Sequence, residues 1–335
     1  MSRERSTPEP EAGPSDIANV PFVIAGGAIL LLVWTGLVAW QTADVDQVLG
    51  VLLDRLVAFA WLFFILLCAA SGGSAVLSRL KRMPRESADA LLFGTAAGLG
   101  LIALGTLVFG VCGLLQRWVL LPALLGFGLT GRRPLAALLK DLCKQAKGLT
   151  GSLTLGKIIW VAIFVLFLAN LTRSYEPPWE YDSLEYHLGA PAIWHREGRV
   201  TFLRDNVYSN MPFNTEMLYL LAMRLRNDPV KGAAIGMAIN AAAALLTALA
   251  LRRAIGNLHS DLAGDFAAGI YYTWPGVALY SGIAYVELLQ QFYGVMALWA
   301  AAMFVRRIDD AKQRSVWRLL AGVMSGLAIG VKYPN

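Results

Sequence analysis

Charged residues are scarce in this sequence. Only 16% of the 335 residues are Asp, Glu, Lys or Arg, whereas 57% are hydrophobic and the mean hydropathy is +0.55. An ordinary soluble domain has about a quarter of its residues charged and roughly 45–50% apolar. This deficit of charge excludes an ordinary cytosolic enzyme, a disordered chain and a collagen-like chain, and it predicts a membrane protein.

Cysteines and the common catalytic signatures are sparse as well. The three cysteines, Cys68, Cys112 and Cys143, show no pairing pattern, so we expect no disulfide framework. The sequence has no glycine-rich phosphate loop, no H-E-x-x-H spacing and no G-x-S-x-G. The loops between apolar stretches on the basic side are too short for a nucleotide-binding domain, so the chain is not expected to bind sugar nucleotides or ATP itself.

Nine apolar stretches predict an all-α, polytopic transmembrane helical bundle. A helix needs about 20 apolar residues to span a bilayer. They divide the chain into a polar tail at 1–19, a first group of spans with basic loops at 20–156, and a second group at 157–335. The predicted spans are Val20–Trp40, Leu49–Ala70, Ala90–Leu114, Trp118–Thr130, Lys157–Leu171, Gly232–Leu251, Leu262–Tyr280, Leu288–Val305 and Leu319–Val331.

Lysine and arginine are distributed unequally between alternate loops. One set of loops holds 19 of the 29 basic residues and the other set holds 8. The positive-inside rule places the richer set in the cytoplasm, together with the N-terminus. Residues 172–231 then form one long extracytoplasmic loop. Since the net charge of +6 is explained by these loops, no nucleic acid partner is expected. The richer set comprises the tail and residues 72–89, 131–157, 252–253 and 306–318.

The long outer loop contains two clusters of polar and aromatic residues. The first, residues 181–188, predicts an interfacial helix with Tyr181, Leu184 and Leu188 toward lipid and its acids turned away. The second, residues 206–217, predicts a turn followed by a short helix over Phe213–Leu225 along the outer surface. Its candidate functional residues are Asp182, Glu185, Tyr186, His187, Tyr208, Asn210 and Glu216.

A structural explanation competes with a functional one for these acids. Asp182 and Glu185 have the spacing of a capping box, in which both stabilise a helix start. His187 lies about 140° around an ideal helix from Asp182, which disfavours a metal site shared by the two.

Two later spans place ionisable groups at the same outer face. Glu287 begins one span just after Tyr285, and the last span finishes with Lys332 and Tyr333. A lysine can neutralise a phosphate, and a carboxylate can remove a proton from an attacking hydroxyl. Together with Asp182 they suit an enzyme that handles an anionic lipid. For Lys332, snorkelling of its ammonium group to the interface is the alternative explanation.

Four runs of residues resemble those of a known family. They are YDSLEYHL at 181–188, YSNMP followed by EML at 208–212 and 216–218, AYVEL at 284–288, and GLAIGVKY at 326–333. They resemble the GT-C superfamily of membrane glycosyltransferases, in the branch of the dolichyl-phosphate-mannose–protein mannosyltransferases and the lipid A aminoarabinose transferase. The likeness is closer to bacterial polyprenyl-phosphate-sugar-dependent transferases of the RgtA/B/C/D-like group.

The resemblance implies a GT-C-like fold and an activity. A sugar would pass from a polyprenyl-phosphate carrier to a glycan, lipid or protein acceptor at the extracytoplasmic face of a bacterial inner membrane. Asp182 would act as general base on the acceptor hydroxyl or orient a divalent metal cation, Glu287 would be a second acid, and Lys332 would approach the donor phosphate. The remaining candidates would bind substrate.

Two other functions stay open at this point. A transporter or flippase of a lipid-linked glycan would use the same outer acids and Lys332 to bind cargo, although transporters usually place ionisable residues near the bilayer midplane. Members of the resembled family also continue for several more spans, so we expect this chain to be incomplete at its C-terminus. An inactive truncated member of the family is therefore the second alternative.

Overall fold

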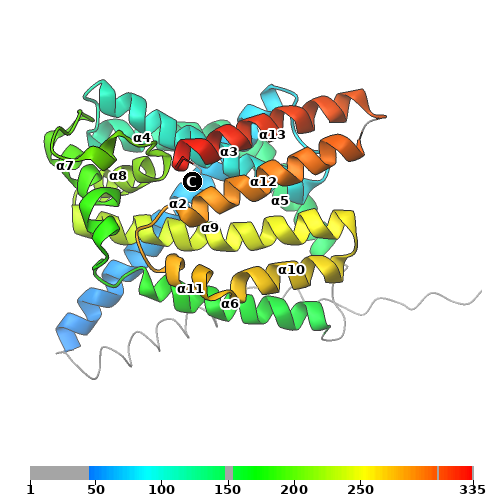
Figure 1. Ribbon diagram of the computed structural model, residues 1–335, viewed down its shortest axis with the longest axis horizontal. Coiled ribbons are helices and arrows are strands. Elements are labelled where there is room, and N and C mark those ends of the chain that lie inside the picture. The colour runs from blue at the N-terminus through cyan, green and yellow to red at the C-terminus, as the bar shows by residue number, and fades with distance from the viewer. Residues whose placement is uncertain (1–44, 148–153, 308, 334–335) are drawn as a thin grey trace, which may run out of the picture.

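The computed structural model describes residues 45–147, 154–307 and 309–333, and these residues form helices and connecting loops without a strand. The predicted span Val20–Trp40 lies outside them. The elements in Figure 1 are α2 (Val45–Arg79), α3 (Ser87–Val111), α4 (Arg117–Thr130), α5 (Arg132–Lys147), α6 (Leu155–Arg173), the π-helix η1 (Ser183–His187), α7 (Gly189–Glu197), the 3₁₀-helix η2 (Val207–Asn210), α8 (Asn214–Arg226), α9 (Pro229–Leu258), α10 (Asp261–Thr273), α11 (Pro275–Ser281), α12 (Glu287–Arg306) and α13 (Ala311–Val331).

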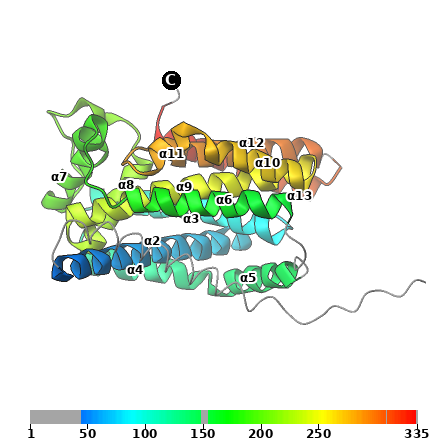
Figure 2. The same ribbon diagram turned by 90° about the horizontal axis from the view of Figure 1, so that it is seen from below.

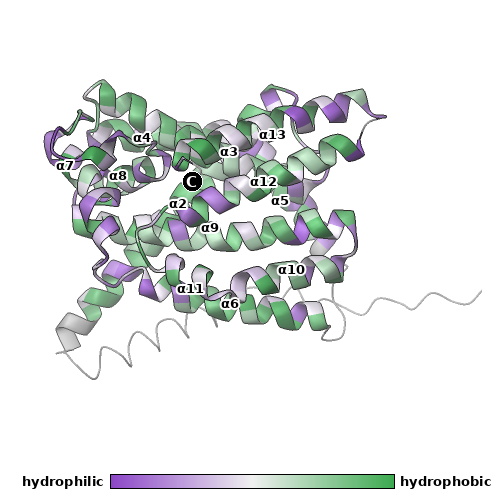
Figure 3. Cartoon of the chain, viewed as in Figure 1, coloured by the Kyte–Doolittle hydropathy of each residue, from purple (hydrophilic) through white to green (hydrophobic). Residues whose placement is uncertain are grey.

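Five helices are long and apolar enough to cross a membrane. They coincide with the second, third, fifth, sixth and eighth predicted spans, as an integral membrane protein requires. Hydrophilic residues gather toward the two ends of the bundle, with mainly hydrophobic helix between them (Figure 3). The five segments are Leu49–Arg79, Ser87–Val111, Leu155–Arg173, Pro229–Leu258 and Glu287–Arg306.

The other predicted spans differ from the structure in length. Trp118–Thr130 is α4, an apolar helix of 14 residues. The prediction of one continuous helix over Leu262–Tyr280 is wrong, because α10 ends before Trp274 and Pro275 begins α11. Trp274 is extended at ψ 131°, as the residue before a proline prefers. The last predicted span belongs to α13, which begins eight residues earlier at Ala311.

The helices form layers, and their basic connections meet at one end. Figure 2 shows α2, α4 and α5 along one side of the bundle and α10 to α13 along the other, with α3 and α9 between them. Arg253 on α9 pairs with Asp89 on α3 at 2.7 Å, and Arg85 pairs with Asp310 before α13 at 2.8 Å. Ser87 also hydrogen-bonds Asp141 on α5. Four of the predicted basic loops therefore share one end, which we call the basic end.

Small residues let α2 and α3 approach closely. A Cβ on Gly98 would lie 1.9 Å from the carbonyl oxygen of Ala69, and one on Gly73 would lie 1.9 Å from that of Gly94. Glycines spaced four residues apart, such as Gly94 and Gly98, permit this close approach of helices in lipid. On α13 a Cβ on Gly330 would lie 2.4 Å from the side-chain nitrogen of Asn214, whereas one on Gly322 or Gly326 would meet no described atom within 4 Å.

The helix predicted over Phe213–Leu225 is present as α8, but its predicted place on the outer surface is wrong. Its residues from Thr215 to Met223 are all buried, and the helix packs between α3, α7 and α9. Asn227 ends α8 in the left-handed conformation, with φ 52°. Because α8 enters the bundle, its single acid, Glu216, is carried into the protein interior.

Candidate active site

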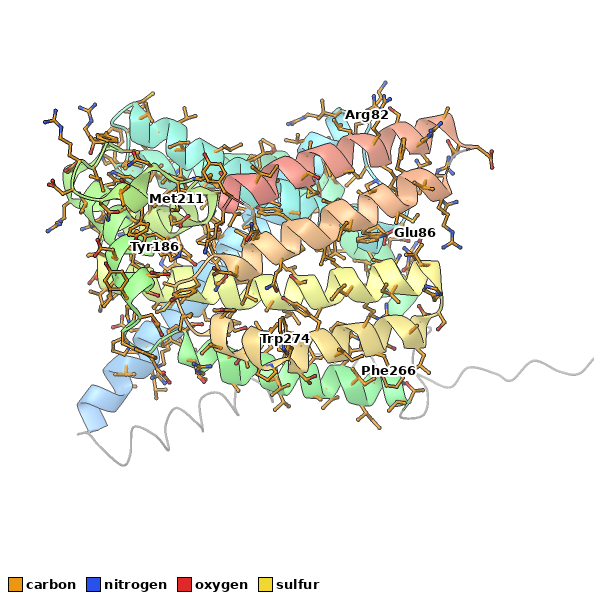
Figure 4. All side chains as sticks on the ribbon, in the orientation of Figure 1. Arg82, Glu86, Tyr186, Met211, Phe266 and Trp274 are labelled. Carbon is orange, nitrogen blue, oxygen red and sulfur yellow. The ribbon has the colours of Figure 1, made fainter. Side chains whose placement is uncertain are left out.

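The segments that carry the family resemblance meet at the end of the bundle opposite the basic end. Figure 4 shows Tyr186 and Met211 at this end and Arg82 and Glu86 at the other. The ring of Tyr186 stacks on that of Tyr208, with centroids 4.9 Å apart, and the ring of His187 lies 5.6 Å from that of Tyr285. Residues separated by up to about 150 positions in the sequence thus form one cluster, which we call the tyrosine–carboxylate cluster.

The first of these segments winds as a π-helix rather than the predicted α-helix. The N–H of Leu188 donates to the carbonyl of Ser183 at 2.8 Å, five residues back. Tyr181 and Leu184 are exposed, in agreement with a lipid-facing side, whereas Tyr186 and His187 are buried. The prediction that Leu188 also faces lipid is wrong, because this residue packs in a buried cluster with α8 and α9. Single π turns are rare and are often found at functional sites. The wide turn directs two neighbouring rings into the cluster.

The capping-box explanation of Asp182 and Glu185 is wrong. Asp182 precedes the π-helix in the right-handed helical region, at φ −62° and ψ −37°, and its side chain makes no capping hydrogen bond. A capping residue is extended and accepts from the second or third N–H of its helix. The carboxylate of Asp182 instead faces the hydroxyl of Tyr186. Asp182 therefore does not act as a helix cap.

A buried histidine–glutamate pair ties the π-helix to α8. Nδ1 of His187 lies 2.6 Å from Oε1 of Glu216, and the two side chains expose 3% and 2% of their surface. Burial raises the pKa of Glu216, and the hydrogen bond with His187 opposes that rise. Within the described residues, Nε2 of His187 and Oε2 of Glu216 have no hydrogen-bond partner. Each of the two side chains therefore has one polar atom left without a described partner.

Carboxylates surround the phenols of the cluster. Burial raises the pKa of Tyr186 well above its ordinary value of 10, and the carboxylates of Asp182, Glu287 and Glu216 raise it further. Burial also raises the pKa of Tyr285, and the nearby carboxylates of Asp182 and Glu287 raise this pKa further. Both phenols therefore stay protonated at neutral pH and act as hydrogen-bond donors. Carboxylates from three separate segments of the chain thus act in the same direction on the pKa of this phenol.

Lys332 and Glu287 form an ion pair at the edge of this cluster. Nζ of Lys332 lies 2.8 Å from Oε1 of Glu287, with side chains 28% and 24% exposed. The amide of Gln290 donates to the carbonyl of Lys332 at 3.0 Å, and the N–H of Val286 donates to Oε2 of Glu287 at 3.1 Å. Lys332 thus turns toward the protein instead of snorkelling freely, and its ammonium group has donors left for a further anion.

Three predicted site residues lie at the margin of the cluster. The carbonyl of Glu185, rather than its carboxylate, accepts a hydrogen bond from the side chain of Asn206 at 2.8 Å. Asn210 is exposed and its amide donates to the nearby carbonyl of Val207. Tyr333 is 59% exposed. For these residues, none of the contacts that the structure describes reaches the buried pair.

Two residues that support the cluster were missed from the sequence. Asn206 is buried and joins η2 to η1. Tyr219 is fully buried on α8, and its hydroxyl donates to the carbonyl of Tyr285 at 2.5 Å. The position of Asn206 before a polar turn was a usable signal, since asparagine commonly caps such turns. Tyr219 gave none, because it reads as one more apolar residue of its helix.

A divalent cation was one predicted cofactor. Among the described residues, no three His, Cys, Asp or Glu side chains are grouped so that they could hold a metal ion. The group that faces Asp182 is the phenol of Tyr186, whereas hard divalent cations bind sets of carboxylate and carbonyl oxygens. A divalent cation at Asp182 therefore stays a prediction from the sequence, and no step below is assigned to one.

Comparison of the chain with protein-family models, curated proteins and solved structures finds no match. The resemblance to the GT-C superfamily therefore stays a prediction from the sequence, and a functional proposal depends on the geometry of the cluster.

Proposed function

We propose that this protein is a membrane glycosyltransferase of the GT-C type, which moves a sugar from a polyprenyl-phosphate carrier to an acceptor hydroxyl at the extracytoplasmic face. One observation carries the proposal. The four segments chosen from the sequence for their family resemblance lie together in space. Tyr186 stacks on Tyr208, and His187 contacts both Glu216 and Tyr285. Glu287, two residues after Tyr285, pairs with Lys332. Segments that resemble a family by chance have no reason to converge on one site.

Asp182 is the proposed general base. It is half-buried beside the phenol of Tyr186, which stays protonated, and it takes part in none of the salt bridges found among the described residues. The acceptor oxygen attacks the anomeric carbon of the sugar and its proton passes to Asp182. The bond from that carbon to the phosphate oxygen breaks, and the lipid phosphate leaves with the electron pair. Attack from the face opposite the phosphate inverts the anomeric configuration.

Lys332 is the proposed partner of the donor phosphate. Glu287 engages one donor of its ammonium group at 2.8 Å and fixes its direction, which leaves two N–H groups for phosphate oxygens. A cation placed where negative charge develops on the leaving group stabilises the transition state more than the ground state. Glu287 then acts by holding Lys332, as a positioning residue at the edge of the site.

The buried pair of His187 and Glu216 is proposed to hold the π-helix in register with α8. Asp182 directly precedes that helix, so the pair fixes the backbone from which the base projects. Positioning of this kind matters because a misplacement of about 1 Å can reduce a rate by roughly a hundredfold.

Exposed aromatic and apolar side chains next to Asp182 support a lipid-borne substrate. Trp179 is 77% exposed and Tyr181 is 68% exposed. Tryptophan and tyrosine concentrate at the level of lipid headgroups, where the phosphate of a polyprenyl carrier also lies. A donor anchored in the bilayer would therefore approach the cluster at the depth of its own phosphate.

The test is a transfer reaction with purified full-length protein in lipid nanodiscs. We would supply a polyprenyl-phosphate hexose labelled in the sugar, add an extract of bacterial glycans and lipids as acceptor, and follow both label and released polyprenyl phosphate. The proposal expects label in an acceptor together with an equal amount of free polyprenyl phosphate. Movement of the intact lipid-linked sugar across a vesicle membrane, without release of polyprenyl phosphate, would indicate a transporter instead.

A further inference from the structure

A large polar cavity lies at the basic end of the bundle, away from the tyrosine–carboxylate cluster. Its volume is about 620 Å³, and it opens between the start of α3, the end of α9, the end of α12 and the start of α13. Ligand-binding cavities in proteins measure roughly 300–1,000 Å³. Four arginines from three different parts of the chain line it: Arg85, Arg253, Arg306 and Arg307.

Two acids, Glu86 and Asp89, also line the cavity, and two of the four arginines form ion pairs. Arg253 pairs with Asp89 at 2.7 Å, and Arg85 pairs with Asp310 at 2.8 Å. Arg306 donates to the backbone carbonyl of Asn257 at 2.5 Å. Among the described residues, neither Arg306 nor Arg307 makes a salt bridge, so no described carboxylate is paired with either guanidinium group.

We propose that this cavity is a binding site for a phosphate group, with Arg306 and Arg307 as its charged donors. The planar guanidinium group matches the oxygens of a phosphate in pairs. Basic pockets between transmembrane helices are also a common way to bind the headgroups of anionic lipids. The volume holds a phosphate together with a substituent such as glycerol. The site is independent of the proposed sugar transfer, because it lies at the opposite end of the bundle.

The phosphate can come from an anionic lipid or from a soluble anion, and the test separates these sources. Purified full-length protein in neutral detergent is titrated with phosphatidylglycerol in mixed micelles, with phosphatidylcholine as the uncharged reference. A second series uses inorganic phosphate, with sodium chloride at equal ionic strength as its reference. Binding is measured from the rise in Tm, since a ligand that binds only the folded state stabilises it by mass action.

The variants compare two neighbouring arginine pairs. Arg306→Gln with Arg307→Gln removes two charges from the cavity, whereas Arg132→Gln with Arg133→Gln removes two exposed charges from the start of α5. The cavity variant is expected to need at least about tenfold more ligand than the unaltered protein for the same rise in Tm. The α5 variant is expected to behave like the unaltered protein. Arg307→Gln alone serves if the double cavity variant does not fold.

The outcomes identify the source or reject the site. A rise in Tm with phosphatidylglycerol alone assigns the cavity to a lipid headgroup, and a rise with inorganic phosphate assigns it to a soluble anion. If neither probe raises Tm beyond its reference, or if both arginine pairs reduce binding equally, the cavity has no specific phosphate site and the proposal is wrong.

Discussion

Nδ1 of His187 lies 2.6 Å from Oε1 of Glu216, and this contact joins two helices that are 29 residues apart in the chain. Both side chains are almost completely buried. In the described residues this contact is the one hydrogen bond between a side chain of η1 and a side chain of α8. It fixes the helix that follows Asp182. Stability and activity are therefore expected to depend on it in different ways.

Removing one partner of this pair should destabilise the protein. His187→Ala leaves a buried carboxyl group without its partner, which costs about 1–3 kcal/mol and more if the carboxyl is charged. Unfolding in detergent, followed by tryptophan fluorescence against urea, measures the loss. The matched control is His259→Ala, which alters an exposed histidine after α9 and should change stability by less than about 0.5 kcal/mol. Equal losses for both variants would contradict an energetic role for the pair.

The pH dependence of stability should report Glu216. Because burial raises the pKa of Glu216 above its ordinary value of 4.5, the folded state retains a proton that the unfolded state has lost. The contribution of this group is therefore fully present below pH 4.5, falls as the pH rises toward the folded pKa, and is constant above it. Glu216→Gln is expected to reduce the fall in Tm between about pH 4.5 and pH 7. Glu185→Gln, which alters a half-exposed acid, should leave that fall unchanged, and the opposite ranking would count against the buried carboxyl.

The contact of α2 with α3 predicts different tolerance at two glycines. Gly98→Ala places a Cβ 1.9 Å from the carbonyl oxygen of Ala69, so the helices must separate at a cost of about 1–3 kcal/mol. Gly326→Ala meets no described atom and should be neutral or stabilise its helix by roughly 0.5–1 kcal/mol. Tm in detergent ranks the two. A stable Gly98→Ala protein would show that the two helices are farther apart than described.

The ion pair of Lys332 and Glu287 predicts a specific pattern in donor binding. If Glu287 acts by holding Lys332, Glu287→Gln should raise KM for the polyprenyl-phosphate sugar, Lys332→Met should raise it more, and the double variant should resemble Lys332→Met alone. Lys231→Met is the control. The ammonium group of Lys231 lies 2.7 Å from the carboxylate of Asp54 and pairs with that residue instead of with an acid of the cluster. Additive effects of the two substitutions would mean that Glu287 acts on substrate directly.

The spans were predictable because long apolar stretches have few alternatives to crossing a bilayer. The break between α10 and α11 was missed although Pro275 lies in the sequence, because an apolar window averages over a single proline. The burial of α8 was missed for a different reason. Glu216, Arg224 and Arg226 suggest a surface helix, and only the partner supplied by His187 from another element makes the interior acceptable for the acid.

The members of the site were easier to predict than their contacts. Asp182, Glu287 and Lys332 each belong to a recognisable run of residues, and the structure places all three at one end of the bundle. The ion pair of Glu287 and Lys332 was not predictable, because the two residues lie at the ends of different helices. The role of Asp182 was also open, because its spacing from Glu185 suits a capping box as well as a catalytic acid. The π turn at Ser183–His187 has no periodic signature, so the burial of Tyr186 followed only from the structure.

The most direct test of the central claim is the single-turnover rate of sugar transfer for Asp182→Asn, compared with Glu185→Gln three residues later. Both substitutions remove one negative charge near the same short helix, but only Asp182 faces Tyr186 within the cluster. Loss of a general base should slow transfer by about 10²–10⁴-fold. The account predicts that loss for Asp182→Asn, at unchanged Tm and donor KM, and a nearly normal rate for Glu185→Gln. A normal rate of transfer by Asp182→Asn would contradict it.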